Sequence, residues 1–255
     1  MKLTILGSGT SQGVPVIACG CEVCRSTDLH DKRLRSSAML EIDGKNIVID
    51  AGSDFRCQML RANVQDIRAI LLTHNHKDHI SGLDDIRAFN WHKNGEAVEI
   101  YSDINTQKSI RREFPYAFEE EKYPGVPEFD LRTVEPEKTF TIDEIEIIPI
   151  PVMHHKMPVL GFRVANFAYI TDANFIPDSS MEKLEGVEYM VINALRKEEH
   201  ISHFTLSQAL EILDKLKVKK GWLTHIGHQM GLTQEFSKGL PLNISAAYDT
   251  MQIEL

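Results

Sequence analysis

The chain has 255 residues, of which 42% are hydrophobic and 25% are charged, and its formal net charge is -9 at pH 7. This composition is typical of a globular protein that buries a substantial core, and it lies far from the disordered, collagen-like and membrane classes. The negative charge argues against a general nucleic-acid binder, because phosphate backbones are bound mainly by Lys and Arg.

The sequence shows no signal or membrane-spanning segment and no linker between domains. The apolar stretch after Met1 is too short for a secretory signal, and no uncharged run approaches the roughly 18 residues of a membrane-spanning helix. We therefore expect a cytoplasmic protein with no membrane partner. No repeat, low-complexity tract or Gly/Ser-rich linker divides the sequence, so residues 1–255 are predicted to form one domain.

Short apolar runs predict the strands of an α/β fold. In chain order they occupy residues 3–6, 38–42, 46–49, 69–72, 145–150, 161–164, 167–170, 190–193 and 221–223. Asp43-Gly44 predicts a tight turn between the second and third strands. Leucines at helical spacing predict a helix over 206–216 with Thr205 as its N-cap, and a weaker pattern covers 106–114. The proline-bearing residues 119–136 are expected to form a surface excursion.

The loop after the first strand is rich in glycine. Gly7, Gly9 and Gly13 form the pattern G-x-G-x-x-x-G, which is not the dinucleotide-binding fingerprint, and no Gly-Lys-Ser/Thr follows to form a phosphate-binding loop. We interpret these glycines as residues of a tight turn that packs closely beneath the functional site.

Three of the four cysteines lie within six positions. Cys19, Cys21 and Cys24 have C-x-C-x-x-C spacing, which favours a zinc site over a disulfide framework in a cytosolic chain. Three thiolates leave a fourth tetrahedral position to another part of the chain. Three free thiols in one loop are the alternative. Cys57 stands alone, and we predict that it is a small buried hydrophobe.

A cluster of histidines follows the predicted strand at 69–72. His74, His76, Asp78 and His79 place three imidazoles and one carboxylate within six positions. A short irregular turn lets such side chains converge, and this ligand mixture suits zinc, iron or manganese. A lone histidine would be interpreted as an ordinary surface or core residue. Four ligand-type residues at the end of a buried strand instead predict a metal site.

This H-x-H-x-D-H pattern resembles the signature of the metallo-β-lactamase superfamily, and the later partners of that signature follow in order, each after an apolar run. The resemblance implies a ligand set for two divalent metal ions: His74, His76 and His154 for the first, Asp78, His79 and His225 for the second, and Asp172 as the bridge. It also implies a four-layered αββα sandwich in a single domain. Periodicity alone does not distinguish that fold from a doubly wound single sheet.

Two of these ligand positions have competing interpretations. His155 is adjacent to His154 and is the competing ligand, although the first histidine position is the one kept in similar proteins. Asp172 lies in a Thr-Asp-Ala-Asn sequence that is also acceptable as a turn or a helix cap. The bridging role is favoured because two cations about 3.5–4 Å apart need a shared anion.

Within the superfamily, the chain most resembles the PhnP-type phosphodiesterases over nearly its full length. Two segments carry this resemblance: the glycine-rich residues 7–15, which lead into the cysteine pattern, and residues 223–228. It implies that His228 completes a structural zinc site with the three cysteines and ties the N-terminal loop to the loop of His225. It also implies that His203 faces the phosphate and donates a proton to the leaving oxygen, with His200 as the competing residue.

The metal-ligand pattern and the resemblance together predict a metal-dependent phosphodiesterase, and the resemblance implies that its substrate is a small cyclic or alkyl phosphate diester. A metal-bridging hydroxide would attack phosphorus, with Asp78 binding a metal and orienting the nucleophile and His203 acting as general acid. The expected cofactors are two divalent ions, Mn, Zn or Fe, and one structural Zn, because the ligand types do not choose among these metals.

Three alternatives to this function follow from the same residues. A transfer-RNA 3′-processing endonuclease shares the histidine cluster, but the sequence shows no long basic arm for gripping RNA. Another esterase of the same fold keeps the same ligands, and a binding protein with structural metals is the non-enzymatic alternative. The expected partner is a small phosphodiester substrate rather than nucleic acid, and a homodimer is an option because superfamily relatives include dimers.

Overall fold

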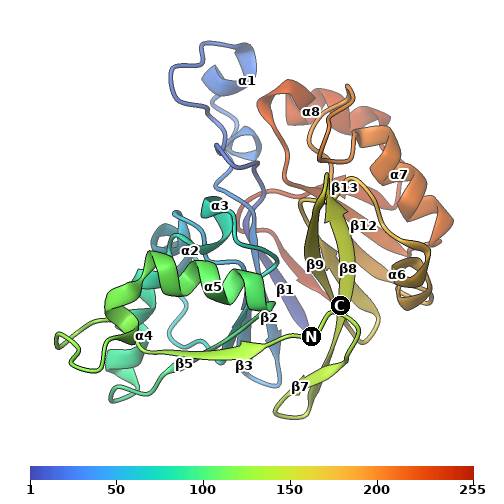
Figure 1. Ribbon diagram of the computed structural model, residues 1–255. Helices are drawn as coiled ribbons and strands as arrows, with labels where there is room; N and C mark the ends of the chain where they lie inside the picture. Colours follow the sequence, from blue (N-terminus) through green and yellow to red (C-terminus); the bar gives the residue numbers. More distant parts are fainter.

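The computed structural model describes residues 1–255 as two mixed β-sheets packed face to face, with helices on both outer faces (Figure 1). The strands of the first sheet are β1 (Lys2–Gly7), β2 (Ser37–Ile42), β3 (Lys45–Ile49), β4 (Ala69–Leu71), β5 (Val98–Ser102), β6 (Phe129–Thr133) and β14 (Gln252–Glu254). The strands of the second are β7 (Phe140–Ile142), β8 (Ile145–His154), β9 (Met157–Val164), β10 (Phe167–Ile170), β11 (Tyr189–Asn193), β12 (Lys220–Thr224) and β13 (Ile244–Ala246). Their orders are β14-β1-β2-β3-β4-β5-β6 and β13-β12-β11-β10-β9-β8-β7.

Helices cover the outer face of each sheet and complete a four-layered αββα sandwich, which confirms the predicted fold class (Figure 1). The α-helices are α1 (Glu22–Arg25), α2 (Phe55–Arg61), α3 (Lys77–Ile80), α4 (Arg87–His92), α5 (Ile104–Glu113), α6 (Asp178–Lys183), α7 (Leu206–Lys215) and α8 (Thr233–Phe236). Short 3-10 helices are η1 (Leu29–Asp31), η2 (Leu83–Ile86), η3 (Pro115–Phe118), η4 (His228–Met230) and η5 (Ser237–Gly239). None of these helices has the length and apolar character needed to cross a bilayer.

Side chains that point alternately to the two faces of each strand form three hydrophobic cores between the layers. In β3, Ile47 and Ile49 point into the core between the two sheets, whereas Val48 points to the core beneath the helices of the first sheet. A third core lies between the second sheet and its helices, and it includes Ala209 and Leu213 of α7. Full burial of each such aliphatic side chain stabilises the fold by about 1.5–3 kcal/mol.

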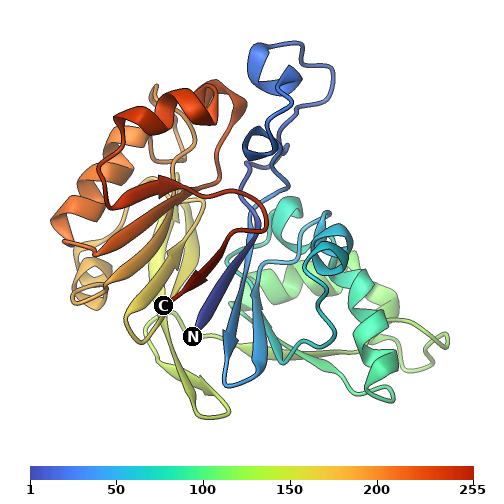
Figure 2. The ribbon, with the colours of Figure 1, turned by 180° about the vertical axis from the view of Figure 1, so that it is seen from behind.

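The ends of the chain lie side by side in the first sheet (Figure 2). The last strand, β14, pairs antiparallel with β1, with Leu3 opposite Ile253. Elsewhere β3 runs parallel to β4, and β10, β11 and β12 run parallel to one another. The carboxyl ends of parallel strands meet at one edge of a sheet, so the loops that follow them are brought together.

All nine predicted strands are present, and five strands were not predicted: β5, β6, β7, β13 and β14. β6 lies inside residues 119–136, so the interpretation of that whole segment as a surface excursion was wrong. The prediction for Cys57 was also wrong, because this residue is exposed. Phe55, Gln58 and Met59 form the buried face of α2, and helical periodicity turns Cys57 away from it.

Candidate metal centre

The histidine motif occupies the turn that connects β4 to α3. His74 lies three residues after the end of the strand and is buried, while His76 is the N-cap residue of α3 and is exposed. Asp78 and His79 lie within this short helix, and the side chain of His79 is fully buried. Backbone bonds from Ala51 to His79 oxygen and from His79 to His76 oxygen hold the turn in place.

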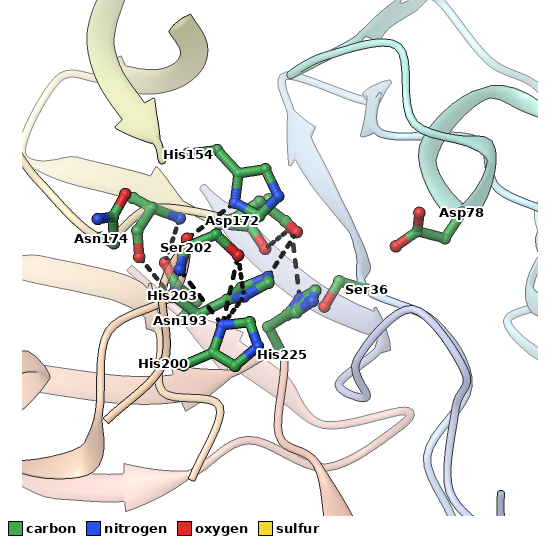
Figure 3. Close-up of polar contacts among 12 residues, drawn as sticks. Ser36, Asp78, His154, Asp172, Asn174, Asn193, His200, Ser202, His203 and His225 are labelled. Atoms are coloured by element: carbon green, nitrogen blue, oxygen red, sulfur yellow. Dashed lines mark hydrogen bonds and ion pairs between the residues drawn. The ribbon is translucent and has the colours of Figure 1, made fainter. Parts of the chain in front are cut away.

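Ligand-type side chains from both halves of the chain converge at the centre. Three groups have ligand atoms that all lie within 4.8 Å of one another: His74, His79 and Asp172; His154, Asp172 and His203; and Asp78, Asp172 and His225. Asp172 belongs to all three groups, so it occupies the middle of the cluster. Figure 3 shows His154, Asp172, His203 and His225 gathered on one side, with Asp78 facing them.

The orientation of two imidazoles depends on Asp50, a residue that the sequence analysis did not single out. Asp50 directly follows β3 and is fully buried. Its carboxylate lies 2.7 Å from His79 Nδ1, and it accepts hydrogen bonds from the Thr73 main-chain N–H and hydroxyl. Thr73 Oγ1 in turn lies 2.9 Å from His74 Nδ1. Both histidines therefore point Nε2 into the cluster.

The hairpin between β8 and β9 decides between the two adjacent histidines. His154 is the last residue of β8, and its side chain is turned into the cluster, whereas His155 is exposed in the turn with φ +57°. Nδ1 of His154 lies 2.8 Å from the carbonyl oxygen of Ser202, which leaves Nε2 for the centre. The structure thus brings His154 into the cluster and leaves His155 outside it.

Three residues of the cluster region have a left-handed backbone within two residues of the end of a strand. Asp50 follows β3 with φ +63°, Asp172 follows β10 with φ +52°, and His225 follows β12 with φ +56°. This conformation is uncommon for residues other than glycine and costs about 1–3 kcal/mol. Asn193 holds the backbone next to Asp172 in this conformation. Its Oδ1 accepts a hydrogen bond from the Ala173 N–H and its Nδ2 donates to the Ala173 carbonyl oxygen, both at 2.9 Å.

His203 and His200 lie one behind the other in the loop between β11 and α7. Nε2 of His203 is 3.1 Å from Asp172 Oδ1, so His203 borders the cluster directly. Nδ1 of His203 is 3.1 Å from both Ser202 Oγ and His200 Nδ1. His200 therefore contacts His203 from the side away from Asp172.

The buried nitrogens of the cluster fit metal coordination better than hydrogen bonding. His74 Nε2, His79 Nε2 and both ring nitrogens of His225 are buried without a hydrogen-bond partner. His79 Nε2 lies 3.1 Å from Asp78 Oδ2 and 3.2 Å from Asp172 Oδ2. Two ligand atoms that share one zinc-like ion at about 2.0–2.1 Å are separated by about 3.3 Å in a tetrahedron. The donor set therefore fits divalent cations.

Electrostatics at the centre also favour a cation. Burial lowers the pKa of His225 to about 4 and places the pKa of His74 well below its usual range, so both rings are neutral near pH 7 and keep a lone pair for a metal. Burial alone would lower the pKa of His79, but the carboxylates of Asp50, Asp172 and Asp78 raise it well above the usual range. These carboxylates impose a negative potential that a bound cation neutralises.

His76 lies at the rim of the cluster. Its ring centroid is 4.5 Å from that of His74 and 5.1 Å from that of His154, but its nitrogens belong to none of the three groups. The structure places His74 in one group with His79, whereas the resemblance assigns these two histidines to different metals.

The predicted zinc ligands form a second, separate cluster. Cys19, Cys21 and Cys24 have their Sγ atoms 3.4, 3.4 and 3.5 Å from His228 Nδ1. Zinc–sulfur bonds of about 2.3 Å and a zinc–nitrogen bond of about 2.0 Å give sulfur–nitrogen separations of about 3.5 Å in a tetrahedron. Hydrogen bonds from the Cys24 N–H and from His228 lower the pKa of Cys21 to about 6, which favours a thiolate at this position, whereas burial raises the pKa of Cys24 to about 11.

The glycine-rich loop connects this second cluster to the central one. Gly9 forms β-bridges with both Arg35 and Ile226, and the N–H of Ile226 donates to Ser8 oxygen. A Cβ on Gly9 would lie 2.9 Å from Arg33 Cβ, so a larger residue does not fit there. Ile226 lies between His225 and His228, and the loop therefore couples the position of His225 to that of the cysteine cluster.

Comparison with known proteins identifies the family. The family model described as a β-lactamase superfamily domain matches residues 45–226. A solved structure described as a new diphosphatase from the PhnP family is 39% identical, with a TM-score of 0.93, and the match covers 100% of this chain and 97% of that one. The structure of human tRNase Z, short form, is 19% identical with a TM-score of 0.71, over 100% of this chain and 99% of that chain, and so shares the fold.

Curated relatives point in two directions. An octanoyltransferase of Porphyromonas gingivalis is 39% identical over 254 residues, which is 99% of this chain and 51% of that protein. A ribonuclease Z of Acaryochloris marina is 28% identical over 167 residues, 64% of this chain and 47% of that protein. The chain thus spans about half the length of these relatives. The family match over residues 45–226, together with the converging histidines and aspartates, shows that the chain belongs to the metallo-β-lactamase superfamily.

Proposed function

We propose that this protein is a phosphodiesterase that uses two divalent metal ions to hydrolyse a phosphate diester of a small organic molecule. The near end-to-end similarity to the PhnP-family diphosphatase carries this proposal, because the matching region includes both the central cluster and the cysteine cluster. Loss of that activity in variants of the central cluster tests the proposal.

The proposed ligand set is the one that the superfamily resemblance implies. In this set His74, His76 and His154 would hold one ion, Asp78, His79 and His225 would hold the other, and Asp172 would be shared by both. The central position of Asp172 among all three ligand groups supports the bridge. The hydrogen bonds that engage Nδ1 of His74, His79 and His154 support the use of Nε2 toward the metals. The cysteine cluster with His228 holds one structural zinc.

Two divalent cations bound at this centre would supply Lewis-acid activation of a water molecule and of the phosphoryl oxygens. The protein supplies the proton for the leaving oxygen, and His203 is placed to hold it at Nε2. This nitrogen borders the centre, and the side chain of His203 is only 12% exposed. Contacts of Nδ1 with Ser202 and His200 fix the direction of the ring. His203 is therefore the proposed general acid, and His200 supports it from behind.

Asp78 has the second proposed role in catalysis. Its side chain is 12% exposed and faces His79 at 3.1 Å, so it reaches both the interior of the cluster and the solvent side. A carboxylate in that position binds a metal ion and orients the attacking water toward phosphorus. The main chain of Asp78 packs closely against Gly52, and this contact holds Asp78 in place.

A diphosphate linkage is the second candidate for the bond cleaved. The PhnP-family neighbour is described as a diphosphatase. A diester and a diphosphate present the same reacting unit, a phosphorus atom whose leaving oxygen carries another substituent, so the same acid and the same metals serve both. The two candidates differ only in what the leaving oxygen carries, an alkyl group or a second phosphoryl group.

Transfer-RNA processing and octanoyl transfer receive less support. The ribonuclease Z relative matches only 64% of this chain, and the net charge of -9 opposes binding to an RNA backbone. Acyl transfer through a covalent intermediate needs a nucleophile such as Cys, Ser or Lys beside the acceptor site. The central groups contain only His and Asp, three cysteines lie in the separate cluster, and Cys57 is exposed on α2.

The test measures metal content and activity in one preparation. Elemental analysis should find about three metals per chain, as expected for a dinuclear site and one structural zinc. With added Mn²⁺, the protein should hydrolyse bis(p-nitrophenyl) phosphate and a 2′,3′-cyclic nucleotide, and His79→Ala should abolish both activities. Preference for a dinucleotide with a diphosphate bridge would select the second candidate. Cleavage of precursor transfer RNA, with no small-molecule activity, would overturn the proposal.

A further inference from the structure

We propose that Asn174 is a positioning residue that holds the candidate ligand His154 and the candidate general acid His203 in register, an inference that rests on the function proposed above. Asn174 lies two residues after Asp172 and does not belong to the metal cluster. Figure 3 shows it beside Ser202 and His203, on the far side of His154 from Asp78.

The side-chain amide of Asn174 touches two loops at once. Its Oδ1 accepts a hydrogen bond from the N–H of His155 at 2.6 Å, at the tip of the β8–β9 hairpin. Its Nδ2 donates to the carbonyl oxygen of Ile201 at 3.3 Å, in the loop that carries His203. His155 is adjacent in sequence to His154, and Ile201 is adjacent to Ser202. His154 and Ser202 also join the same two loops by a direct hydrogen bond.

This direct hydrogen bond runs between His154 Nδ1 and the carbonyl oxygen of Ser202 and is 2.8 Å long. With the two bonds of Asn174 it forms a closed ring: Asn174 to His155, His154 to Ser202, and Ile201 back to Asn174. A shift of either loop would stretch at least one bond of this ring. The ring therefore couples the orientation of the His154 imidazole to the position of Ser202, whose hydroxyl contacts His203.

Both loops need such a support. At the hairpin tip, the non-glycine residue His155 has a left-handed backbone with φ +57°. The other loop, residues 194–205, contains no helix or strand. Asn174 is itself anchored, because its N–H donates to Met153 oxygen and the N–H of Met153 donates to Phe175 oxygen, both at 2.9 Å. A fixed backbone at position 174 can therefore transmit its geometry to both loops.

Asparagine suits this position because an amide offers a donor and an acceptor on one short side chain. Asn174→Asp keeps the acceptor for His155 and loses the donor to Ile201. Asn174→Ala loses both. The matched control is Asn166→Ala, because Asn166 lies at the other end of β10 and its Nδ2 donates to Glu188 Oε2 at 3.0 Å. It removes one comparable bond far from the centre.

The experiment compares these variants by Mn²⁺ binding calorimetry and by turnover at saturating Mn²⁺ on two substrates. Bis(p-nitrophenyl) phosphate has a good leaving group and depends little on a general acid. A 2′,3′-cyclic nucleotide releases an alkoxide and depends on one. We expect N174A to bind Mn²⁺ about 10- to 100-fold more weakly than N166A. We also expect its kcat to fall by at least about tenfold on the cyclic nucleotide, with much less change on the aryl ester.

N174D separates the two bonds: Mn²⁺ affinity should stay close to that of the wild type, while the ratio of cyclic-nucleotide to aryl-ester turnover should fall. If N174A does not fold, this ratio in N174D decides. Values for N174A equal to those for N166A in both measurements would overturn the proposal. If the wild type hydrolyses neither substrate, the proposed function fails, and Mn²⁺ binding by the variants still decides the role of Asn174.

Discussion

Gly52 lies against the main chain of Asp78 so closely that a Cβ on Gly52 would overlap the carbonyl oxygen of Asp78. The same contact continues on both sides, since the N–H of Ala51 donates to His79 oxygen and the N–H of Gly82 donates to Ala51 oxygen. The loop that carries Asp50 is thus packed directly on the helical turn that carries two proposed ligands. This packing is the physical link between strand β3 and the metal centre.

Gly52→Ala should therefore displace the turn of Asp78 and His79. The added methyl group meets main-chain atoms rather than a flexible side chain, so we expect a loss of about 1–3 kcal/mol of stability, together with weaker metal binding. Thermal unfolding and metal analysis check both effects. Gly239→Ala is the control, because nothing lies within 4 Å of its Cβ position. Equal behaviour of the two variants would contradict the proposed packing.

Asp50→Asn should weaken metal binding although it replaces none of the proposed ligands. The amide keeps the size of the side chain but removes the charge that faces His79 Nδ1 at 2.7 Å, so His79 becomes a poorer and less well oriented ligand. We expect Mn²⁺ affinity to fall by about 10- to 100-fold, measured by calorimetry. Asp43→Asn, in an exposed turn, serves as the control. Unchanged affinity in Asp50→Asn would show that Asp50 only stabilises the fold.

His203→Ala should depress turnover and leave the metal content unchanged. Without a general acid, we expect kcat on a 2′,3′-cyclic nucleotide to fall by about 10²- to 10⁴-fold. His200→Ala should have a smaller effect, because His200 reaches the centre only through His203. The exposed His155→Ala is the control. A parallel loss of bound metal in His203→Ala would assign His203 to the ligand set instead.

Cys24→Ser should remove the structural zinc and lower the melting temperature. The serine oxygen replaces a thiolate in a four-ligand cluster, and binding at this cluster contributes directly to folding. Zinc per chain should fall by about one, and activity should also decline because the glycine-rich loop couples this cluster to His225. Cys57→Ser changes an exposed thiol outside the cluster and should do neither. Full zinc retention in Cys24→Ser would contradict the site.

Asp143 should make the stability of the fold depend on pH in the acid range. Hydrogen bonds from Arg68 and Lys45 hold the pKa of its carboxyl below the usual range. Stability from this group is therefore fully present above the unfolded pKa of about 4 and is lost as pH falls toward the lower folded value. Asp143→Asn should lower the melting temperature at neutral pH, and its difference from the wild type should shrink below pH of about 4. Glu144→Gln, with a side chain 95% exposed, should show no such trend.

Much of this protein follows from its sequence alone. Apolar runs such as 46–49 and 69–72 became buried strands because strands covered on both faces must be apolar throughout. The histidine motif and the cysteine spacing are local patterns that could be recognised in the sequence, whereas distant members such as Asp172, His225 and His228 were named only through the family resemblance. Strands that the sequence did not predict, such as β6 and β14, lie at the edges of a sheet, where exposed residues interrupt the apolar pattern.

Tertiary structure decided the features that depend on contacts between distant segments. Asp50 and Asn174 are ordinary turn residues in the sequence, and only the packing of β3 against β4, and of the hairpin against the loop of His203, gives them partners at the centre. The choice of His154 over His155 likewise depends on which side chain the hairpin turns inward. A sequence pattern reports local chemistry, whereas the direction of a side chain is set by the strands and loops that surround it.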